Sequence, residues 1–314
     1  MAIDHVKLAD ELAELRSLAL KKLAEEPLPQ GSEANRRIRA EIRELGLEAN
    51  IADLETQGYT LLGPGEAAPI EFTNRLRDAI VRVADQEEAA LKEGTGSPGS
   101  GTGTLHGFLV ARDRIFEEVL TQPKPLTLAT YLLGYRLKLS QCAGLVKDAT
   151  SEPLFFHADH TRKIPAPWPS VSQYCNVSWL LTEYTRENGA LCVFPGSHKF
   201  CHDVPERLRM AHDHEDVKLI EAPAGSVIVW HGNLWHGAVP RTAPGKRVTL
   251  VLPHVRYAIQ PQELFWASTT EEMIQRNPPR FASLMGLTAA WPWGYRSYDP
   301  AALAAGPTSS SPFE

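Results

Sequence analysis

The chain of 314 residues is 43% hydrophobic and 22% charged, a composition typical of a globular protein that buries a large core. Its formal net charge of −6 disfavours a general nucleic-acid binder, because such proteins usually present a net basic face. The sequence has no run of about 18 apolar residues, and its N-terminal stretch is charged throughout. We therefore expect no membrane span, no signal peptide and a cytoplasmic protein.

Helical patterns dominate residues 1–93. Apolar residues recur at three- and four-residue spacings in three segments, at residues 4–26, 32–46 and 70–93. Ser32 is placed to cap the second segment and Gly46 to end it, while Arg37 and Glu41 can pair one helical turn apart. These signals predict a mostly helical N-terminal part.

Residues 94–104 are rich in glycine and serine, which predicts a flexible loop. The loop contains a GxGxxG match at Gly94, Gly96 and Gly99. The dinucleotide fingerprint requires a strand before these glycines and a helix after them, whereas here a helical pattern comes first and Pro98 interrupts the next segment. We therefore expect no nucleotide at this loop.

The pattern changes at Tyr135. Short runs rich in β-branched and aromatic residues, separated by Gly, Pro, Asn and Asp, continue to about residue 258. Many short strands without regularly intervening helices indicate a sandwich, a barrel or a jelly roll. Asn188-Gly189 lies between two such runs and predicts a hairpin. The four cysteines form no CxxC pair, so we expect free thiols.

The stretch LFFHADHTRK, residues 154–163, carries groups that can ligate a metal. On a strand, His157 and Asp159 project to the same face. Two histidines and one carboxylate are the ligand set of non-haem Fe(II) oxygenases, whereas a structural zinc site would close its coordination shell. The third ligand must come from a distant strand, and the segment VIVWHGNLWHGAVPR offers His231 and His236.

Two nearby alternatives are weaker. HDHED contains a second HxD pair, His214 and Asp216, in a run that is polar at every position and predicts a solvated loop. His160 follows Asp159 directly and would point to the opposite face of a strand, so we expect it to be a neighbour of the site and not a ligand.

Three blocks in one order, HAD, ENGALCVFPGSHK and GSVIVWHGNLWHGAVPRTAPGKR, resemble the phytanoyl-CoA dioxygenase family of Fe(II)- and 2-oxoglutarate-dependent oxygenases. The resemblance runs from about residue 135 to 258. It implies that His157, Asp159 and His236 bind Fe(II). In that family an arginine eleven residues beyond the last ligand binds the distal carboxylate of 2-oxoglutarate, and Arg247 stands at this offset.

The resemblance also implies the fold. We expect a mainly β protein with helical additions, in which residues 135–258 form a double-stranded β-helix, the jelly roll of cupin-like proteins. The helices of residues 1–93 would pack against this core. We predict a single oxygenase domain over residues 1–298 and a flexible tail over 299–314, which is rich in proline and serine.

Other residues are candidates for holding 2-oxoglutarate. Thr249 shares a strand face with Arg247, and Gln141 lies on a strand leading toward the site. Either could compensate for Ala238, which stands where the family often has a serine. Arg241 is a rival anchor for the cosubstrate, although its Pro- and Gly-rich surroundings predict a mobile loop.

Trp168 and Arg162, which both follow the HxD pair in the sequence, are candidates for contacting the substrate. Trp168, in the proline-stiffened segment IPAPWPS, is predicted either to cover the substrate as a hydrophobic lid or to pack on the surface. Arg162 is predicted either to contact an anionic group or to be solvated.

The implied function is hydroxylation of a small, fairly apolar metabolite, with O2 and 2-oxoglutarate consumed and succinate and CO2 released. The carboxylate of Asp159 favours oxygen insertion or dehydrogenation, because related halogenating enzymes replace it by a small residue. The alternatives are a non-catalytic cupin-like barrel that binds a metal or ligand, a zinc hydrolase with the same triad, and an oxygenase that acts on an acyl-CoA or desaturates its substrate.

Overall fold

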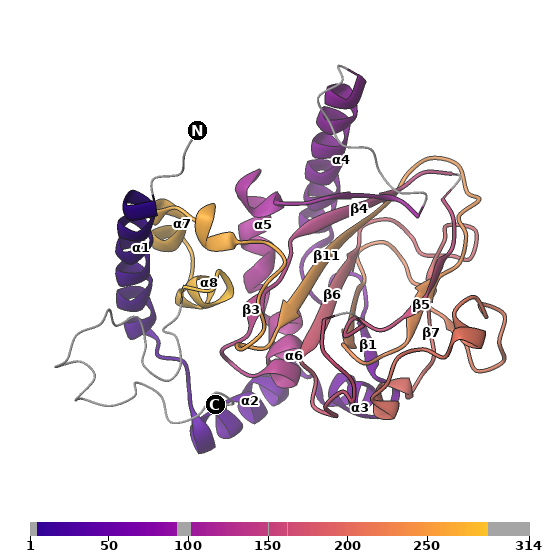
Figure 1. The fold of residues 1–314 in the computed structure, drawn as a ribbon, viewed down its shortest axis with the longest axis horizontal. Helices are drawn as coiled ribbons and strands as arrows, with labels where there is room; N and C mark the ends of the chain where they lie inside the picture. Colours follow the sequence, from indigo (N-terminus) through magenta and orange to yellow (C-terminus); the bar gives the residue numbers. More distant parts are fainter. Residues whose placement is uncertain (1–4, 93–101, 150, 162, 288–314) are drawn as a thin grey trace.

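The computed structural model describes residues 5–92, 102–149, 151–161 and 163–287. Residues 93–101, Arg162 and the predicted tail at 299–314 lie outside these ranges. The helices at residues 70–92 and 123–133 pack against one side of a large antiparallel sheet, and a small sheet lies on the other side (Figure 1). This arrangement agrees with the expected jelly-roll core with helices packed against it.

The main helices have these bounds: α1 His5–Glu25, α2 Gly31–Leu45, α3 Glu48–Gln57, α4 Ile70–Lys92, α5 Ile115–Glu118, α6 Pro123–Leu133, α7 Glu271–Arg276 and α8 Pro279–Leu284. None of the helices within the described ranges has the length and apolarity needed to cross a bilayer.

The three predicted N-terminal helices are present as α1, α2 and α4. Gly46 ends α2 in the left-handed region, at a φ of 66°, and Arg37 Nε donates to Glu41 Oε1 over 3.0 Å. The predicted cap is wrong, because α2 begins at Gly31 after Gln30 without a side-chain cap, and the Ser32 hydroxyl accepts from Arg36 instead. Helices α3, α5, α6, α7 and α8 were not expected, since no sustained amphipathic period marks them in the sequence.

The strands have these bounds: β1 Tyr59–Leu62, β2 Thr104–His106, β3 Lys138–Leu139, β4 Ala143–Lys147, β5 Leu154–His157, β6 Tyr174–Leu180, β7 Leu191–Val193, β8 Lys218–Leu219, β9 Val227–His231, β10 His236–Ala238 and β11 Arg247–Val255.

These strands form two antiparallel sheets. The large sheet has the order β1-β9-β6-β11-β4-β2, with β3 also paired to β11, and the small sheet has the order β5-β10-β7-β8. Strands β1 and β2 come from before residue 135, so the sheet recruits more of the chain than the segment predicted as its core. The predicted hairpin at Asn188-Gly189 is wrong, because β6 and β7 on either side of it belong to different sheets.

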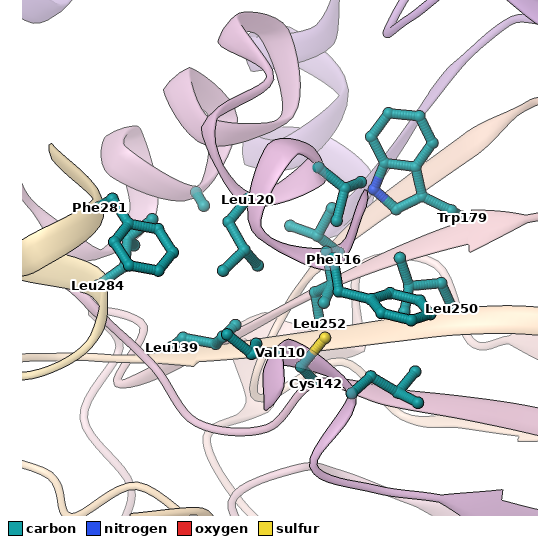
Figure 2. Packing of buried hydrophobic residues seen from close by; sticks show 14 of the residues in the cluster. Val110, Phe116, Leu120, Leu139, Cys142, Trp179, Leu250, Leu252, Phe281 and Leu284 are labelled. Carbon is teal, nitrogen blue, oxygen red and sulfur yellow. The ribbon is translucent and has the colours of Figure 1, made fainter. Parts of the chain in front are cut away.

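Side chains along β11 alternate between the helix-facing and the cavity-facing side of the large sheet. Leu250 and Leu252 face the helices, whereas Thr249 and Val251 line a cavity on the opposite face. Figure 2 shows the two leucines on the helix side of the sheet, close to Phe116. Apolar side chains thus anchor one face of β11 to the helices, and the other face is free to carry polar groups.

Buried histidines make the stability of this fold depend on pH. Burial is the main cause that lowers the pKa of His254, on β11, to about 4 from an ordinary value of 6.5. The folded chain therefore binds fewer protons at His254 than the unfolded chain between these pH values. The contribution of neutral His254 to the free energy of unfolding is fully present above pH 6.5 and is lost as the pH falls toward 4.

The free energy of unfolding falls between pH 7 and pH 5 in the wild type. We predict that in His254→Leu this decrease is smaller by about 2 kcal/mol. Urea denaturation followed by circular dichroism at the two pH values measures this difference. His202→Leu, at an exposed histidine, is the control and should retain the full loss. An unchanged pH dependence in His254→Leu would show that His254 is not held neutral.

Candidate active site

The first element of the site is the pairing of β5 with β10. His157 ends β5 and His236 begins β10, and the two residues lie directly opposite each other in the antiparallel register. Their ring centroids are 4.3 Å apart. Asp159 follows two residues beyond the end of β5. One ligand atom from each of these three residues lies within 4.8 Å of the others, and this is the one such group among the described residues.

Backbone contacts orient both imidazoles. His157 Nδ1 lies 3.0 Å from the carbonyl oxygen of Phe155, and His236 Nδ1 lies 3.0 Å from that of Leu234. A carbonyl oxygen can only accept, so Nδ1 carries the proton in each ring and Nε2 keeps its lone pair. Both rings therefore have the tautomer that a metal ligand needs.

Burial favours the neutral form of His236. Burial is the largest cause that lowers the pKa of His236 to about 4, and the charge of a protonated His157 contributes in the same direction. At neutral pH the His236 ring is therefore neutral, and a metal does not have to displace a proton from it.

Asp159 supplies the carboxylate of the group. Its Oδ2 accepts a hydrogen bond of 2.9 Å from the indole N–H of Trp230, on β9. Burial by itself raises the pKa of Asp159, but His236, Lys163, His157 and the Trp230 hydrogen bond outweigh it, so that the net pKa is lowered. The side chain is thus ionised and fixed in direction.

Gly237 allows the two ligand-bearing strands to approach. A Cβ atom at this position would lie 2.7 Å from the carbonyl oxygen of Leu154, on β5. No side chain fits in this space unless the backbone moves. Gly237 therefore sets the distance between β5 and β10, and with it the distance between His157 and His236.

Arg247 lies at the start of β11 and is buried, with 2% of its surface exposed. Its Nη1 donates to the carbonyl oxygen of Gly189, its Nε has no hydrogen-bond partner, and its guanidinium carbon lies 4.4 Å from the ring centroid of Tyr184. Burial lowers the pKa of Arg247, although an arginine remains protonated at neutral pH. A buried cation with an unused donor fits an anionic ligand.

The histidines, Asp159 and Arg247 line one cavity of about 390 Å³. Gln141 and Thr249, both predicted to help hold 2-oxoglutarate, also line this cavity, as does Ala238. The hydroxyl groups of Thr249 and Tyr184 are 2.6 Å apart. The cavity therefore brings the donor atoms for a metal and the donor groups for an anion into one space.

The rival ligand and the rival anchor lie elsewhere. His231 is outside the donor group and faces His198, with ring centroids 5.3 Å apart. Arg241 does not line the cavity, and it is not on a mobile loop as predicted. It is buried, and its Nε donates to Asn188 Oδ1 over 2.9 Å. A side-chain to side-chain hydrogen bond thus orders a segment whose composition indicated mobility.

His160 and Trp168 pack behind the site. His160 is fully buried outside the donor group, with its ring centroid 5.7 Å from that of Trp168. Trp168 belongs to an apolar cluster with Phe156, and its indole N–H donates to the carbonyl oxygen of Ile164. It is buried and does not line the cavity, so neither of the two predicted placements, a lid or surface packing, is confirmed. Arg162, the other predicted substrate contact, lies outside the described residues.

Three functional candidates were missed in the sequence. Trp230 donates its indole N–H to Asp159 and lines the cavity. Tyr184 and Lys147 also line the cavity. No local motif marks any of the three, because their positions depend on which strands become neighbours in the sheets.

The structure brings together two histidines and a carboxylate on a jelly roll, with a buried arginine in the same cavity, which is the arrangement that the family resemblance implies. The family model for phytanoyl-CoA dioxygenase (PhyH) matches residues 54–249. The chain therefore belongs to the phytanoyl-CoA dioxygenase family, which confirms the resemblance found in the sequence.

Curated relatives include two dioxygenases from fungi. Dioxygenase af480 of Aspergillus fumigatus is 30% identical over 189 residues, which cover 58% of this chain and 58% of the relative. Dioxygenase FrzG of Cladobotryum is 26% identical over 168 residues, which cover 51% of this chain and 53% of the relative. The chain thus spans little more than half the length of these relatives.

Solved structures share the fold. EctD from S. alaskensis, in its apo form, has a TM-score of 0.55 and 22% identity, over 68% of this chain and 78% of EctD. HygX from Streptomyces hygroscopicus, with nickel and 2-oxoglutarate bound, has a TM-score of 0.55 and 16% identity, over 68% of this chain and 88% of HygX.

We predict that Trp230→Phe weakens metal binding about 10- to 100-fold, because it removes the donor that orients Asp159 but keeps an aromatic ring in the cavity wall. Calorimetric titration of the purified protein with Mn(II) measures the affinity. Trp179→Phe, on the helix side of the same sheet, is the matched control, since its indole N–H has no partner. Equal affinities in Trp230→Phe and the wild type would contradict the role given to Trp230.

Proposed function

We propose that this protein is an Fe(II)- and 2-oxoglutarate-dependent oxygenase that hydroxylates a small, fairly apolar organic molecule. One observation carries the proposal. The ligand atoms of His157, Asp159 and His236 lie within 4.8 Å of one another, and the buried guanidinium of Arg247 lines the same cavity. A barrel that only bound a metal would not need a buried arginine with an unused donor beside it.

In the proposed site, His157 and His236 would hold Fe(II) through Nε2, and Asp159 would hold it through a carboxylate oxygen. Two histidines and one carboxylate are the ligand set of non-haem Fe(II) oxygenases. Iron, when bound, supplies the oxidative chemistry, with decarboxylation of 2-oxoglutarate to succinate and CO2. The protein contributes the fixed directions of its three ligands.

Arg247 would bind the distal carboxylate of 2-oxoglutarate. A planar guanidinium can donate two parallel hydrogen bonds to a carboxylate, which fixes the direction as well as the charge. The Thr249 and Tyr184 hydroxyls, 2.6 Å apart, provide a further donor beside Arg247. These groups supply the polar contacts that the alanine at position 238 does not.

The cavity also indicates the kind of substrate. Its volume of about 390 Å³ has to contain both 2-oxoglutarate and the part of the substrate that reacts. This volume is at the lower end of the range for small-molecule sites, roughly 300–1,000 Å³. Apolar side chains form much of the wall, namely Leu105, Leu145, Leu154, Leu191 and Val251. A small molecule with an apolar reacting carbon fits this cavity better than the bulky polar part of an acyl-CoA.

Two structural neighbours agree with a small-molecule substrate. HygX has been solved with hygromycin B bound, and SnoN is a non-haem α-ketoglutarate-dependent epimerase from nogalamycin biosynthesis. SnoN has a TM-score of 0.51 and 18% identity to this chain. This likeness concerns the fold, and it indicates neither the size nor the identity of the substrate.

We expect Fe(II) and 2-oxoglutarate, added without oxygen, to give a weak visible charge-transfer band, and air to convert 2-oxoglutarate to succinate. Asp159→Ala should remove the band and lower succinate formation by at least about 100-fold, because the metal loses its one carboxylate ligand. Absorption spectroscopy and chromatographic measurement of succinate test both outcomes, and a metabolite library with detection of product mass would reveal the hydroxylated compound.

Asp216→Ala is the matched control. It removes the carboxylate of the second HxD pair, whose side chain is 76% exposed and lies 3.7 Å from His214 Nδ1, away from the cavity. This variant should retain wild-type activity. Full activity in Asp159→Ala would refute the ligand assignment, and product formation with zinc and without 2-oxoglutarate would favour a hydrolase.

A further inference from the structure

A second cavity lies among the helices, away from the metal ligands. We call it the helix-side cavity; it has a volume of about 380 Å³ and is lined by residues of α2 and α6, by residues 26–29 and by Arg280 on α8. Figure 1 shows α2 and α6 next to each other. No described residue lines both this cavity and the active-site cavity. Sites for small molecules have volumes of roughly 300–1,000 Å³, so the helix-side cavity is large enough to hold one.

The guanidinium of Arg280 has an unused donor in this cavity. Its Nη2 donates to the hydroxyl of Thr130 over 2.9 Å, while its Nε is buried without a hydrogen-bond partner. Burial is the main cause that lowers the pKa of Arg280 to about 10 from 12.5, so the side chain still carries its charge at neutral pH. A buried donor on a charged group costs free energy until an acceptor compensates for it.

The two carboxylates of the cavity wall are engaged elsewhere. Glu26 and Glu41 both accept from Arg37, and the distance from Arg37 Nε to Glu41 Oε1 is 3.0 Å. The charged side chains that line the cavity are thus two arginines and two glutamates, with a net charge of zero. Arg280 can therefore accept one negative charge from a ligand, whereas a second negative charge would be repelled by the glutamates.

Tyr135 provides another donor in the same cavity. The guanidinium carbon of Arg280 lies 5.0 Å from the centroid of its ring, and that of Arg37 lies 5.7 Å from it. These cation–π contacts hold the ring in place. The hydroxyl of Tyr135 is buried without a hydrogen-bond partner. Buried polar groups in native proteins nearly always have partners, so two unused donors in one cavity indicate a ligand with two acceptor atoms.

We propose that the helix-side cavity binds a small monocarboxylic acid with an apolar body, at a site separate from the one where oxidation takes place. One carboxylate oxygen accepts from Arg280 Nε, and the other accepts from the hydroxyl of Tyr135. The apolar side chains that contact the body of the acid are Pro27, Leu28, Pro29, Pro123 and Leu126. A monocarboxylate fits better than a phosphate, because its single charge is matched by Arg280 alone.

The proposed ligand joins three parts of the helical layer. It contacts α2, α6 and α8 at once, so it binds the folded chain and stabilises it by mass action. Helix α6 in turn packs against β6 and β9 of the large sheet. Binding needs neither iron nor 2-oxoglutarate, and the proposal therefore stands or falls independently of the proposed function.

Isothermal titration of the purified protein with hexanoate tests the proposal. We expect Arg280→Met to weaken hexanoate binding about 10- to 100-fold, the range of a charge-assisted hydrogen bond, and Tyr135→Phe to weaken it about 2- to 10-fold. Hexanamide has the same length but no charge, and it should bind the wild type at least about 10-fold more weakly than hexanoate. Saturation with Mn(II) and 2-oxoglutarate should leave the hexanoate affinity unchanged, because the two cavities share no described residue.

Arg36→Met is the matched control. Arg36 is an exposed arginine of α2 that donates to Ser32 and does not line the cavity, so this variant should bind hexanoate as the wild type does. Circular dichroism verifies that each variant is folded, and Tyr135→Phe decides the question if Arg280→Met is not. The proposal is overturned if the wild type binds none of butanoate, hexanoate and octanoate, or if hexanamide binds as tightly as hexanoate. Wild-type affinity in the folded variants of Arg280 and Tyr135 would place the acid elsewhere and also refute it.

Discussion

The site depends on the antiparallel pairing of β5 and β10, which places His157 opposite His236. Neither strand is long, and neither could hold a metal without the other. The pairing fixes two imidazoles on neighbouring backbones, and the carbonyl oxygens of Phe155 and Leu234 select the tautomer of each ring. Rigid strands give such ligands a more precise placement than loops would, because the hydrogen bonds of the ladder restrict the backbone.

The large sheet contributes the second half of the site through side-chain alternation. Residues of β11 that face the helices are apolar, and those that face the small sheet include Arg247 and Thr249. Helices α4 and α6 thus stabilise the sheet from behind and leave its other face for polar groups. Burial of that face makes each charge on it costly unless a ligand compensates for it, which connects the fold directly to anion binding.

Much of the site could be predicted from short-range sequence signals. The i,i+2 spacing predicted that His157 and Asp159 share a face, and the resemblance to the family, whose arginine stands eleven residues beyond the last ligand, pointed to Arg247. The positions of Lys147 and Trp230 in the cavity wall could not be found in this way, since they follow from the register of β4 against β11 and from the approach of β9 to Asp159. The prediction of a mobile loop at Arg241, made from local composition, was wrong, because this residue forms a hydrogen bond with Asn188, which is distant in the sequence.

Gly237 shows how closely spacing and chemistry are linked in this protein. Because the backbone of β5 occupies the space of a side chain, even an alanine there would act as a wedge between the two strands. The imidazole rings would then be driven apart although every donor atom was still present. A change of one methyl group would thus displace the two imidazoles while the set of ligands stayed intact, so the geometry of the metal site depends on a residue that has no side chain.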